Sequence, residues 1–248
     1  MTAPSWPAAS ATAPGIWDCD LASGQVRGAY VALSGNTAAG KSSLLAAVER
    51  TLRAGGVDAV GVSERAFHHR YLRLMFSEPA DFAFPIQLSF MLERYMVLLR
   101  NLVQLGRTVI MERSHLDDHL FVEEHVRSGA ISDEQRAAYA ALAGTLHVRL
   151  PVPDVIVLMN PDPELSLARL AAAERAGHRP AEFPSEEAKA AWVHRWHDLY
   201  VELHRSFARR QASDPAFAGT TLLELDPAGD QRDSAAAVIA AVRPYLPR

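Results

Sequence analysis

The sequence predicts an α/β fold in which a parallel five-stranded sheet carries helices on both faces. Short, continuously apolar segments alternate along the chain with longer segments whose apolar residues recur at helical spacing. This alternation is typical of a sheet that is buried on both faces and built through right-handed crossovers. In addition, a glycine-rich segment, 35–42, lies between the first apolar segment and the first helical one.

The expected elements can be assigned in chain order. The strands are five short apolar runs at 29–34, 57–63, 108–111, 154–159 and 221–225. The helices are expected at 41–54, 85–104, 116–127, 133–149, 164–176, 186–210 and 234–245. No repeat, linker or second compositional boundary interrupts them, so residues 28–248 are predicted to form one domain. Residues 1–27 are rich in Ala, Pro, Ser, Thr and Gly without an apolar period, and a disordered leader is predicted there.

Composition and charge narrow the class of protein. With 248 residues, 49% of them hydrophobic, the chain is long and apolar enough for a buried core. The net charge of −4 argues against a surface devoted to nucleic acid or to an acidic membrane, so neither is expected as a partner. Cys19 is the single cysteine, no signal-peptide pattern is found, and no stretch approaches the roughly 18 apolar residues of a membrane helix. A cytoplasmic protein is expected.

Lysine is almost absent from the chain. Of the 25 basic residues, only Lys41 and Lys189 are lysines. Coding bias toward arginine explains the shortage, and it makes each surviving lysine informative. Lys41 lies in the glycine-rich segment, whereas Lys189 lies in a helix expected to be solvated, where replacement by Arg should have almost no effect. In that helix Trp192, Trp196 and Tyr200 recur every four residues, a spacing typical of core packing.

The glycine-rich segment satisfies the pattern G-x-x-x-x-G-K-[ST], and it follows a strand and precedes a helix. Backbone N–H groups of such a loop point at phosphate oxygens, Lys41 would reach the β- and γ-phosphates, and Ser42 would ligate Mg²⁺. We therefore predict a sheet of the P-loop NTPase type that binds ATP and Mg²⁺. The residues expected to bind the nucleotide are Gly35, Asn36, Thr37, Ala38, Ala39, Gly40, Lys41, Ser42 and Ser43.

Charged residues follow two further strands. In an open parallel sheet the ligand lies beyond the carboxyl ends of the strands, which makes Glu64, Glu112 and Arg113 candidate site residues. Glu64 could accept a proton from a nucleophilic hydroxyl, and Glu112 could hold Mg²⁺ or its water. Arg113 could neutralise the charge that develops during the reaction.

A group of arginines follows the fourth strand. Arg169, Arg175 and Arg179 lie before or within a stretch that also contains Gly177 and Pro180. Phosphoryl transfer needs cations around the γ-phosphoryl group and exclusion of water. This stretch is therefore predicted to be an arginine-bearing lid that closes over the nucleotide.

Together these motifs resemble those of the deoxyribonucleoside kinase family, in particular kinases of the deoxycytidine and deoxyguanosine type. The resemblance covers nearly the whole chain after residue 28, and Glu112-Arg113-Ser114 matches the family's [DE]-R-S signature. It implies transfer of the ATP γ-phosphate to a nucleoside 5′-hydroxyl, with Glu64 as general base and with Lys41 and Arg113 as catalytic cations. It also implies a homodimer.

The resemblance further identifies a set of substrate-binding residues, namely Glu64, Phe76, Gln87, Met91, Arg94, Arg113 and Asp118. Gln87 and Arg94 are seven residues apart and so share one helix face. Gln87 offers a donor and an acceptor to a base edge, and an Arg94–Asp118 pair would leave Asp118 able to accept from an exocyclic amine. A cytosine or purine base is therefore favoured over thymine.

Several residues depart from the family pattern. Phe76 stands where the family usually has a Tyr whose hydroxyl contacts the sugar, which leaves the choice between ribose and deoxyribose open. Arg65 stands where a Pro is common, and His68 and His69 lie near the usual place of a Trp. Ala173 replaces one lid arginine.

Three other interpretations stay open. A nucleoside-monophosphate kinase of the thymidylate kinase type shares the P-loop and the acidic-Arg motif, and Arg65 and Arg70 could hold its substrate phosphate. A kinase of another small molecule, such as an antibiotic-like nucleoside, would account for Phe76 and Ala173. The non-enzymatic alternative is a regulatory module that binds ATP without transferring phosphate.

Overall fold

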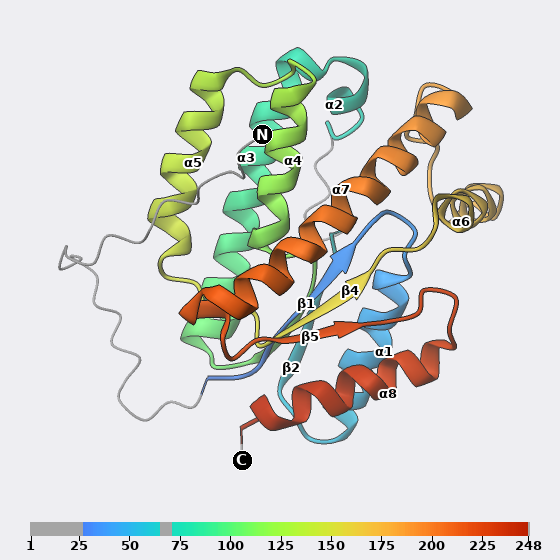
Figure 1. The fold of residues 1–248 in the computed structure, drawn as a ribbon. Helices are drawn as coiled ribbons and strands as arrows, with labels where there is room; N and C mark the ends of the chain where they lie inside the picture. Colours follow the sequence, from blue (N-terminus) through green and yellow to red (C-terminus); the bar gives the residue numbers. More distant parts are fainter. Residues whose placement is uncertain (1–26, 65–70, 248) are drawn as a thin grey trace.

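The computed structural model describes residues 27–64 and 71–247. The predicted leader, apart from Arg27, lies outside the described residues, and so do Arg65, His68, His69 and Arg70. A parallel five-stranded sheet forms the centre of the molecule, with the strand order β2-β3-β1-β4-β5 (Figure 1). The strands are β1 (Tyr30–Gly35), β2 (Ala59–Val62), β3 (Thr108–Glu112), β4 (Val155–Met159) and β5 (Thr221–Glu224).

The register aligns the carboxyl ends of the three central strands. Leu33 of β1 lies opposite Glu112 of β3, and Gly35 of β1 lies opposite Met159 of β4. Every residue of β1 and β3 is buried, as expected for parallel strands covered on both faces. The loops that leave these strands therefore start from one edge of the sheet, where the sequence places its candidate site residues.

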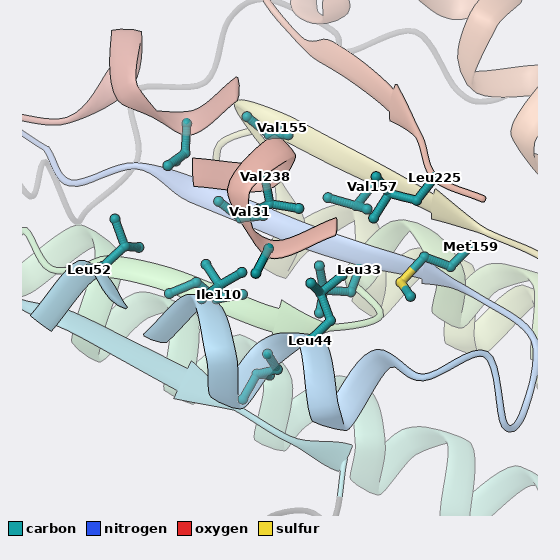
Figure 2. Packing of buried hydrophobic residues seen from close by; sticks show 14 of the residues in the cluster. Val31, Leu33, Leu44, Leu52, Ile110, Val155, Val157, Met159, Leu225 and Val238 are labelled. Carbon is teal, nitrogen blue, oxygen red and sulfur yellow. The ribbon is translucent and has the colours of Figure 1, made fainter. Parts of the chain in front are cut away.

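One face of the sheet is covered by α1 (Lys41–Ala54) and α8 (Gln231–Val242), as Figure 1 shows. Leu44 of α1 and Val238 of α8 pack on Val31 and Val155 of the central strands (Figure 2). Burying an aliphatic side chain of this kind contributes about 1.5–3 kcal/mol. This cluster anchors α1, and with it the loop that precedes α1.

Long helices lie on the opposite side of the sheet (Figure 1). They are α3 (Pro79–Leu98, continued by the π-helical turn Leu99–Gln104), α4 (His115–Arg127), α5 (Asp133–His147) and α7 (Glu186–Ser213), and α5 packs on α3 and α4. The shorter elements are α2 (Leu74–Ser77), α6 (Pro163–Arg175) and two 3₁₀ turns, Pro215–Phe217 and Arg243–Tyr245. The predicted fold class, an α/β protein with helices on both faces of a five-stranded parallel sheet, is confirmed.

Local sequence signals set the start of α4. Ser114 is its N-cap and accepts a hydrogen bond from the backbone N–H of Leu116, while the Asp117 carboxylate accepts from the backbone N–H of Ser114. This reciprocal pair is a capping box. Asp117 also accepts a hydrogen bond from Ser34 of β1 at 2.7 Å, so the first turn of α4 is tied to the sheet beside the candidate site.

The long helix α3 differs from its prediction in two respects. It begins at Pro79 and runs through Pro85, which was expected to be its first residue. Pro79 takes the first-turn position that suits proline, and Pro85 is tolerated because α3 is packed against α2, α4 and α5. The segment Pro79–Gln104 also has the length and apolar composition that would suffice to cross a membrane, contrary to expectation. In this structure 39% of an apolar 18-residue window within that segment is buried, and the segment carries the buried polar side chains Gln87 and Arg94.

Candidate active site

The loop between β1 and α1 has the backbone that its glycines allow. A Cβ on Gly35 would lie 1.7 Å from the Met159 carbonyl oxygen, so only glycine fits between β1 and β4. Gly40 has a φ of +91° and caps α1 without any side-chain hydrogen bond. The first amides of α1 are therefore not capped by a side chain and are available to an anion beside the helix N-terminus.

The side chain of Lys41 binds backbone carbonyl groups of its own loop. Its ammonium donates to the carbonyl oxygens of Gly35 at 2.9 Å and Asn36 at 2.6 Å, and the residue is only 7% exposed. Burial, aided by the nearby Arg113 charge, lowers the pKa of Lys41 to about 8, although Glu64 and other carboxylates oppose the shift. A phosphate anion at the loop would stabilise the charged ammonium and so raise that pKa.

Glu112 ends β3 with one oxygen bound and the other without a partner. Its Oε2 accepts from the Ser63 hydroxyl at 3.0 Å and from the Glu64 backbone N–H at 2.8 Å. Its Oε1 is buried and has no hydrogen-bond partner among the residues that the structure describes. A buried carboxylate oxygen of this kind is a hard-cation ligand, and the exposed Ser42 hydroxyl lines the same cavity. These two residues fit a site that would hold Mg²⁺ and would leave its remaining positions to other oxygen ligands.

Glu64 and Arg113 form an ion pair in the cavity that the loop also lines. Arg113 Nη1 contacts Glu64 Oε1, and Arg94 Nη2 lies 3.9 Å from the same oxygen. Burial favours a higher pKa for Glu64, but the positive charges of Arg113, Lys41 and Arg94 outweigh it and hold the pKa below its usual value. Glu64 is therefore an ionised carboxylate that can accept a proton near neutral pH.

Arg94 also forms a second buried ion pair, which joins α3 to α4. Arg94 Nη1 donates to Asp118 Oδ1 at 3.0 Å, while Asp118 Oδ2 is buried and has no partner among the described residues. Burial and the nearby Asp117 charge raise the pKa of Asp118 to about 6, with Arg94 acting in the opposite direction. Gln87 lies two helical turns before Arg94 on the same face of α3. Its Nε2 donates to the weak acceptor Met75 Sδ at 3.5 Å. The pair and Gln87 line the same cavity, as predicted for a site that reads a base.

The arginines after β4 reach the loop in two places. Arg169 donates to the carbonyl oxygens of Ala38 at 3.3 Å and Pro227 at 2.6 Å. Arg179 donates to the Thr37 hydroxyl at 3.1 Å and pairs with Glu182. Arg175, by contrast, is exposed and does not line the cavity.

Lys189 corrects the expectation of a solvated lysine. The residue is 3% exposed, and its ammonium contacts Glu174 of α6 at 2.6 Å and Glu186 of α7 at 2.8 Å. The hydrogen bonds that the ammonium donates to these two carboxylates raise the pKa of Lys189. The pair with Glu174 joins the helices on either side of the stretch 176–185, which carries Arg179. The premise of a solvated lysine, from which Lys189→Arg was expected to be nearly silent, is therefore wrong.

One cavity of about 770 Å³ unites these groups. Of the predicted site residues, it is lined by Thr37, Ala38, Ala39, Gly40, Lys41, Ser42, Ser43, Glu64, Phe76, Gln87, Arg94, Glu112, Arg113, Asp118, Arg169 and Arg179. Gly35 and Asn36 are buried at the start of the loop, and Met91 of α3 is fully buried in the core. These three support the cavity walls without lining them.

Aromatic side chains line one part of the cavity, and the sequence did not predict this arrangement. Phe183 and Trp192 line the cavity beside Phe76, with ring centroids 5.4 Å and 5.2 Å from that of Phe76. Trp196 and Tyr200 are buried as expected of a core stripe, but Trp192 from the same stripe faces the cavity. Its spacing gave no signal of this, because Phe76, the ring that it meets at the cavity, is distant in sequence.

The fold and the loop are those of the P-loop NTPase class, with an acidic and a basic residue at the end of the neighbouring strand β3. A family model described as deoxynucleoside kinase matches residues 31–182, and the chain belongs to this family. Two curated relatives come from Dictyostelium discoideum: a deoxyadenosine kinase, 24% identical over 58% of this chain, and a deoxyguanosine kinase, 27% identical over 56%. The matches span 57% and 48% of those proteins, about half of their length.

Solved structures support the fold. Deoxyadenosine kinase from M. mycoides, solved with bound dCTP and with bound dATP, matches this chain with TM-scores of 0.61 and 0.62 at 15% and 14% identity. Each match covers 86% of this chain and 98% of the other. At such identity the likeness is evidence for a shared fold.

Proposed function

We propose that this protein is an ATP- and Mg²⁺-dependent nucleoside kinase that phosphorylates the 5′-hydroxyl of a nucleoside or deoxynucleoside. The observation that carries the proposal is the presence, in one cavity, of a phosphate-binding loop, an ionised Glu64 held by Arg113, and the buried Arg94–Asp118 pair. The family match and the named kinases among the relatives support it.

The chain's own groups can perform each step of the transfer. Glu64 accepts the proton of the 5′-hydroxyl as its oxygen bonds to the γ-phosphorus, and the bond to the ADP oxygen breaks. Lys41 and the loop amides hold the phosphates. Arg113, supported by Arg179 from the lid side, offsets the negative charge that is shared among the γ-phosphoryl oxygens. Closure of the lid stretch excludes water from the reaction.

The proposed metal site consists of Ser42 and Glu112. Mg²⁺, when bound, would offset the charge of the β- and γ-phosphates. Among the residues that the structure describes, no group of three or more His, Cys, Asp or Glu side chains could hold a metal by itself. This agrees with an ion that shares its ligands between the chain and the nucleotide, as Mg²⁺ commonly does.

The free oxygen of Asp118 supports a base preference. Asp118 lines the cavity, and its Oδ2, which has no partner among the described residues, can accept a hydrogen bond from an exocyclic amine. Cytosine and adenine present such an amine beside a ring nitrogen, whereas thymine presents a carbonyl oxygen that would face the carboxylate. We therefore favour a cytosine or purine nucleoside over thymidine as the substrate.

A homodimer is proposed as the assembly. Leu92 and Met96, four residues apart on α3, are 39% and 57% exposed. Large apolar side chains that adjoin on one helix face are favourable when a second subunit covers them. The same face of α3 in a second copy would supply a matching apolar surface.

The cations near Glu64 favour a hydroxyl acceptor over a nucleoside monophosphate. Arg113 and Arg94 both have a carboxylate within ion-pair distance, so their charge is already offset. A substrate phosphate would compete with Glu64 and Asp118 for them. Arg65 and Arg70, which could bind such a phosphate, lie outside the described residues.

A phosphate-transfer screen tests the proposal. Radiolabelled ATP and Mg²⁺ are incubated with the protein and with ribonucleosides, deoxyribonucleosides and their monophosphates, and Glu64→Gln serves as the inactive control. We expect labelled 5′-monophosphates from cytidine or purine nucleosides. Label in diphosphates alone would indicate the monophosphate kinase, and tight ATP binding without transfer to any acceptor would indicate a regulatory module.

A further inference from the structure

Arg113 is held by three elements of the fold. Its Nη1 contacts Glu64, and its Nε donates to the Tyr200 hydroxyl of α7 at 2.8 Å. Its guanidinium carbon lies 4.8 Å from the centre of the Phe121 ring of α4. The Phe121 ring in turn stacks on Trp196 of α7, with a centroid distance of 4.1 Å. Two of the three supports of Arg113 therefore depend on α7.

The backbone of Arg113 needs these supports. Its φ of +56° lies in the left-handed region, which costs a residue with a side chain about 1–2 kcal/mol. Such a conformation persists only where surrounding contacts determine it. The backbone N–H of Arg113 donates to Leu33 of β1 at 2.9 Å, and the side-chain contacts fix the rest.

Helix α7 is itself fixed to the edge of the sheet. Asn36, in the phosphate-binding loop, donates to the Val193 carbonyl oxygen at 3.0 Å, and Asn160, after β4, donates to that of His197 at 3.0 Å. His197 Nδ1 lies 3.1 Å from the Pro161 carbonyl oxygen. Tyr200 follows on the same helix and is fully buried. Its hydroxyl is therefore a fixed point relative to the loop that binds the phosphates.

We infer that Tyr200 is a positioning residue of the transfer reaction, which sets the direction of the Arg113 guanidinium through its Nε. The inference rests on the proposed kinase function. With Nε engaged by Tyr200, the contact with Glu64 goes through Nη1 alone of the two terminal nitrogens. Arg113 can then hold Glu64 and still offer donors to the transferring phosphoryl group.

Loss of the Tyr200 hydroxyl would change the geometry of this pair. Without a partner at Nε, the guanidinium can turn its fork toward Glu64 and form two parallel hydrogen bonds, the arrangement that Arg and carboxylates favour. Both the general base and the cation would then be occupied with each other. Substrate and ATP would still bind, since neither the loop nor the Arg94–Asp118 pair is altered.

Tyr200→Phe removes the hydroxyl and keeps the ring that packs on Trp196. We expect kcat to fall about 10- to 100-fold, the effect of a misplaced catalytic group, while KM for ATP and for the nucleoside stay within about twofold of the wild type. Tyr139→Phe is the matched control. Tyr139 is equally buried, its hydroxyl has no partner among the described residues, and it lies in the packing of α5. Its kcat should be unchanged.

A double-mutant cycle connects the effect to Arg113. Arg113→Lys keeps the charge but removes Nε and the fork, so adding Tyr200→Phe to it should lower kcat by less than about twofold. An equal further loss in both backgrounds would show that Tyr200 does not act through Arg113 and would overturn the inference. So would a wild-type kcat for Tyr200→Phe, or KM values that rise as kcat falls. If the wild-type protein transfers phosphate to no acceptor, the proposed function fails instead.

Discussion

Lys41 and Lys189 are both buried and both bind two oxygen atoms, but the oxygens differ in charge. Lys41 donates to two neutral carbonyl groups of its own loop, and burial lowers its pKa to about 8. Lys189 donates to two carboxylates from different helices, which raise its pKa. The ammonium of Lys41 therefore keeps a charge that its direct partners do not neutralise, and an incoming phosphate can use it. The charge of Lys189 is already offset by carboxylates of the fold, so this lysine contributes to the packing of the helices instead.

The largest expected effect tests the Lys41 side of this comparison. Lys41→Arg should lower phosphate transfer by about 1000-fold, because a planar guanidinium cannot take the place of a compact ammonium between two carbonyl groups and two phosphates. The thermal midpoint should change little, since the wild-type contacts are hydrogen bonds within one loop. Transfer assays and a thermal melt on the same sample check both. Activity within tenfold of the wild type would remove Lys41 from its proposed role.

Glu64 provides the next test, because it is a carboxylate near Lys41 that must be ionised to act as the proposed general base. Glu64→Gln should lower kcat by about 100-fold through loss of the general base, while the dissociation constant for ATP stays within about threefold. Steady-state kinetics and equilibrium binding of ATP separate the two quantities. Glu64→Asp is a useful companion, since it retains the carboxylate. If Glu64→Gln turned over at the wild-type rate, another group would have to accept the proton.

The Asp118 carboxylate gives a pH-dependent test. Its raised pKa of about 6 means that it is protonated below pH 6, where it loses the free acceptor proposed to bind an exocyclic amine. The ratio of kcat/KM for cytidine or adenosine nucleosides to that for thymidine should fall about tenfold from pH 7 to pH 5. A ratio cancels ionisations that both substrates share. The ratio in Asp118→Asn should not vary with pH, and a pH-independent ratio in the wild type would exclude Asp118 as the base reader.

The same ionisation predicts a change in stability. The folded protein binds the Asp118 proton more tightly than the unfolded chain, because its pKa is raised from the usual 3.8 to about 6. The resulting stabilisation is complete below about pH 4 and is lost as the pH rises through 6. Denaturant melts between pH 4.5 and 7 should therefore show a smaller loss of stability with rising pH in Asp118→Asn than in the wild type.

The P-loop and the residues after β2 and β3 were predictable because short local patterns fix them. The motif determines the backbone of the loop, and strand ends in a parallel sheet share one edge, which places Glu64, Glu112 and Arg113 together. Continuous apolar runs likewise revealed the strands. The four-residue helix α2 was missed because it is too short to show a period.

Contacts between distant segments could not be predicted from the sequence. Phe183 of the lid segment and Trp192 of α7 contact Phe76 of α2 at the cavity, although α2 is distant from both in sequence. Tyr200 had the spacing of a core residue, and nothing local marks the hydroxyl that meets Arg113. Such contacts depend on how helices pack, and single-residue patterns along one helix do not encode that packing.

The smallest expected effect concerns Lys189, whose two carboxylate partners lie three and fifteen residues away. Lys189→Met keeps much of the apolar stem but leaves Glu174 and Glu186 without their cation. Because Glu186 is 81% exposed, the pair with Glu174 carries most of the effect, and we expect a loss of about 1–2 kcal/mol. This corresponds to a thermal midpoint lower by about 3–6 °C.

Lys189→Arg should lie between Met and the wild type, since a guanidinium keeps the charge but does not fit the same two oxygens at 2.6 and 2.8 Å. In Lys189→Met, KM for ATP should rise about threefold while kcat is retained, because α6 and α7 flank the stretch that carries Arg179. If Lys189→Met had the thermal midpoint and the KM for ATP of the wild type, the buried ion pair would stabilise neither the fold nor the lid stretch. Lys41 and Lys189 would then differ only in the charge of their partners.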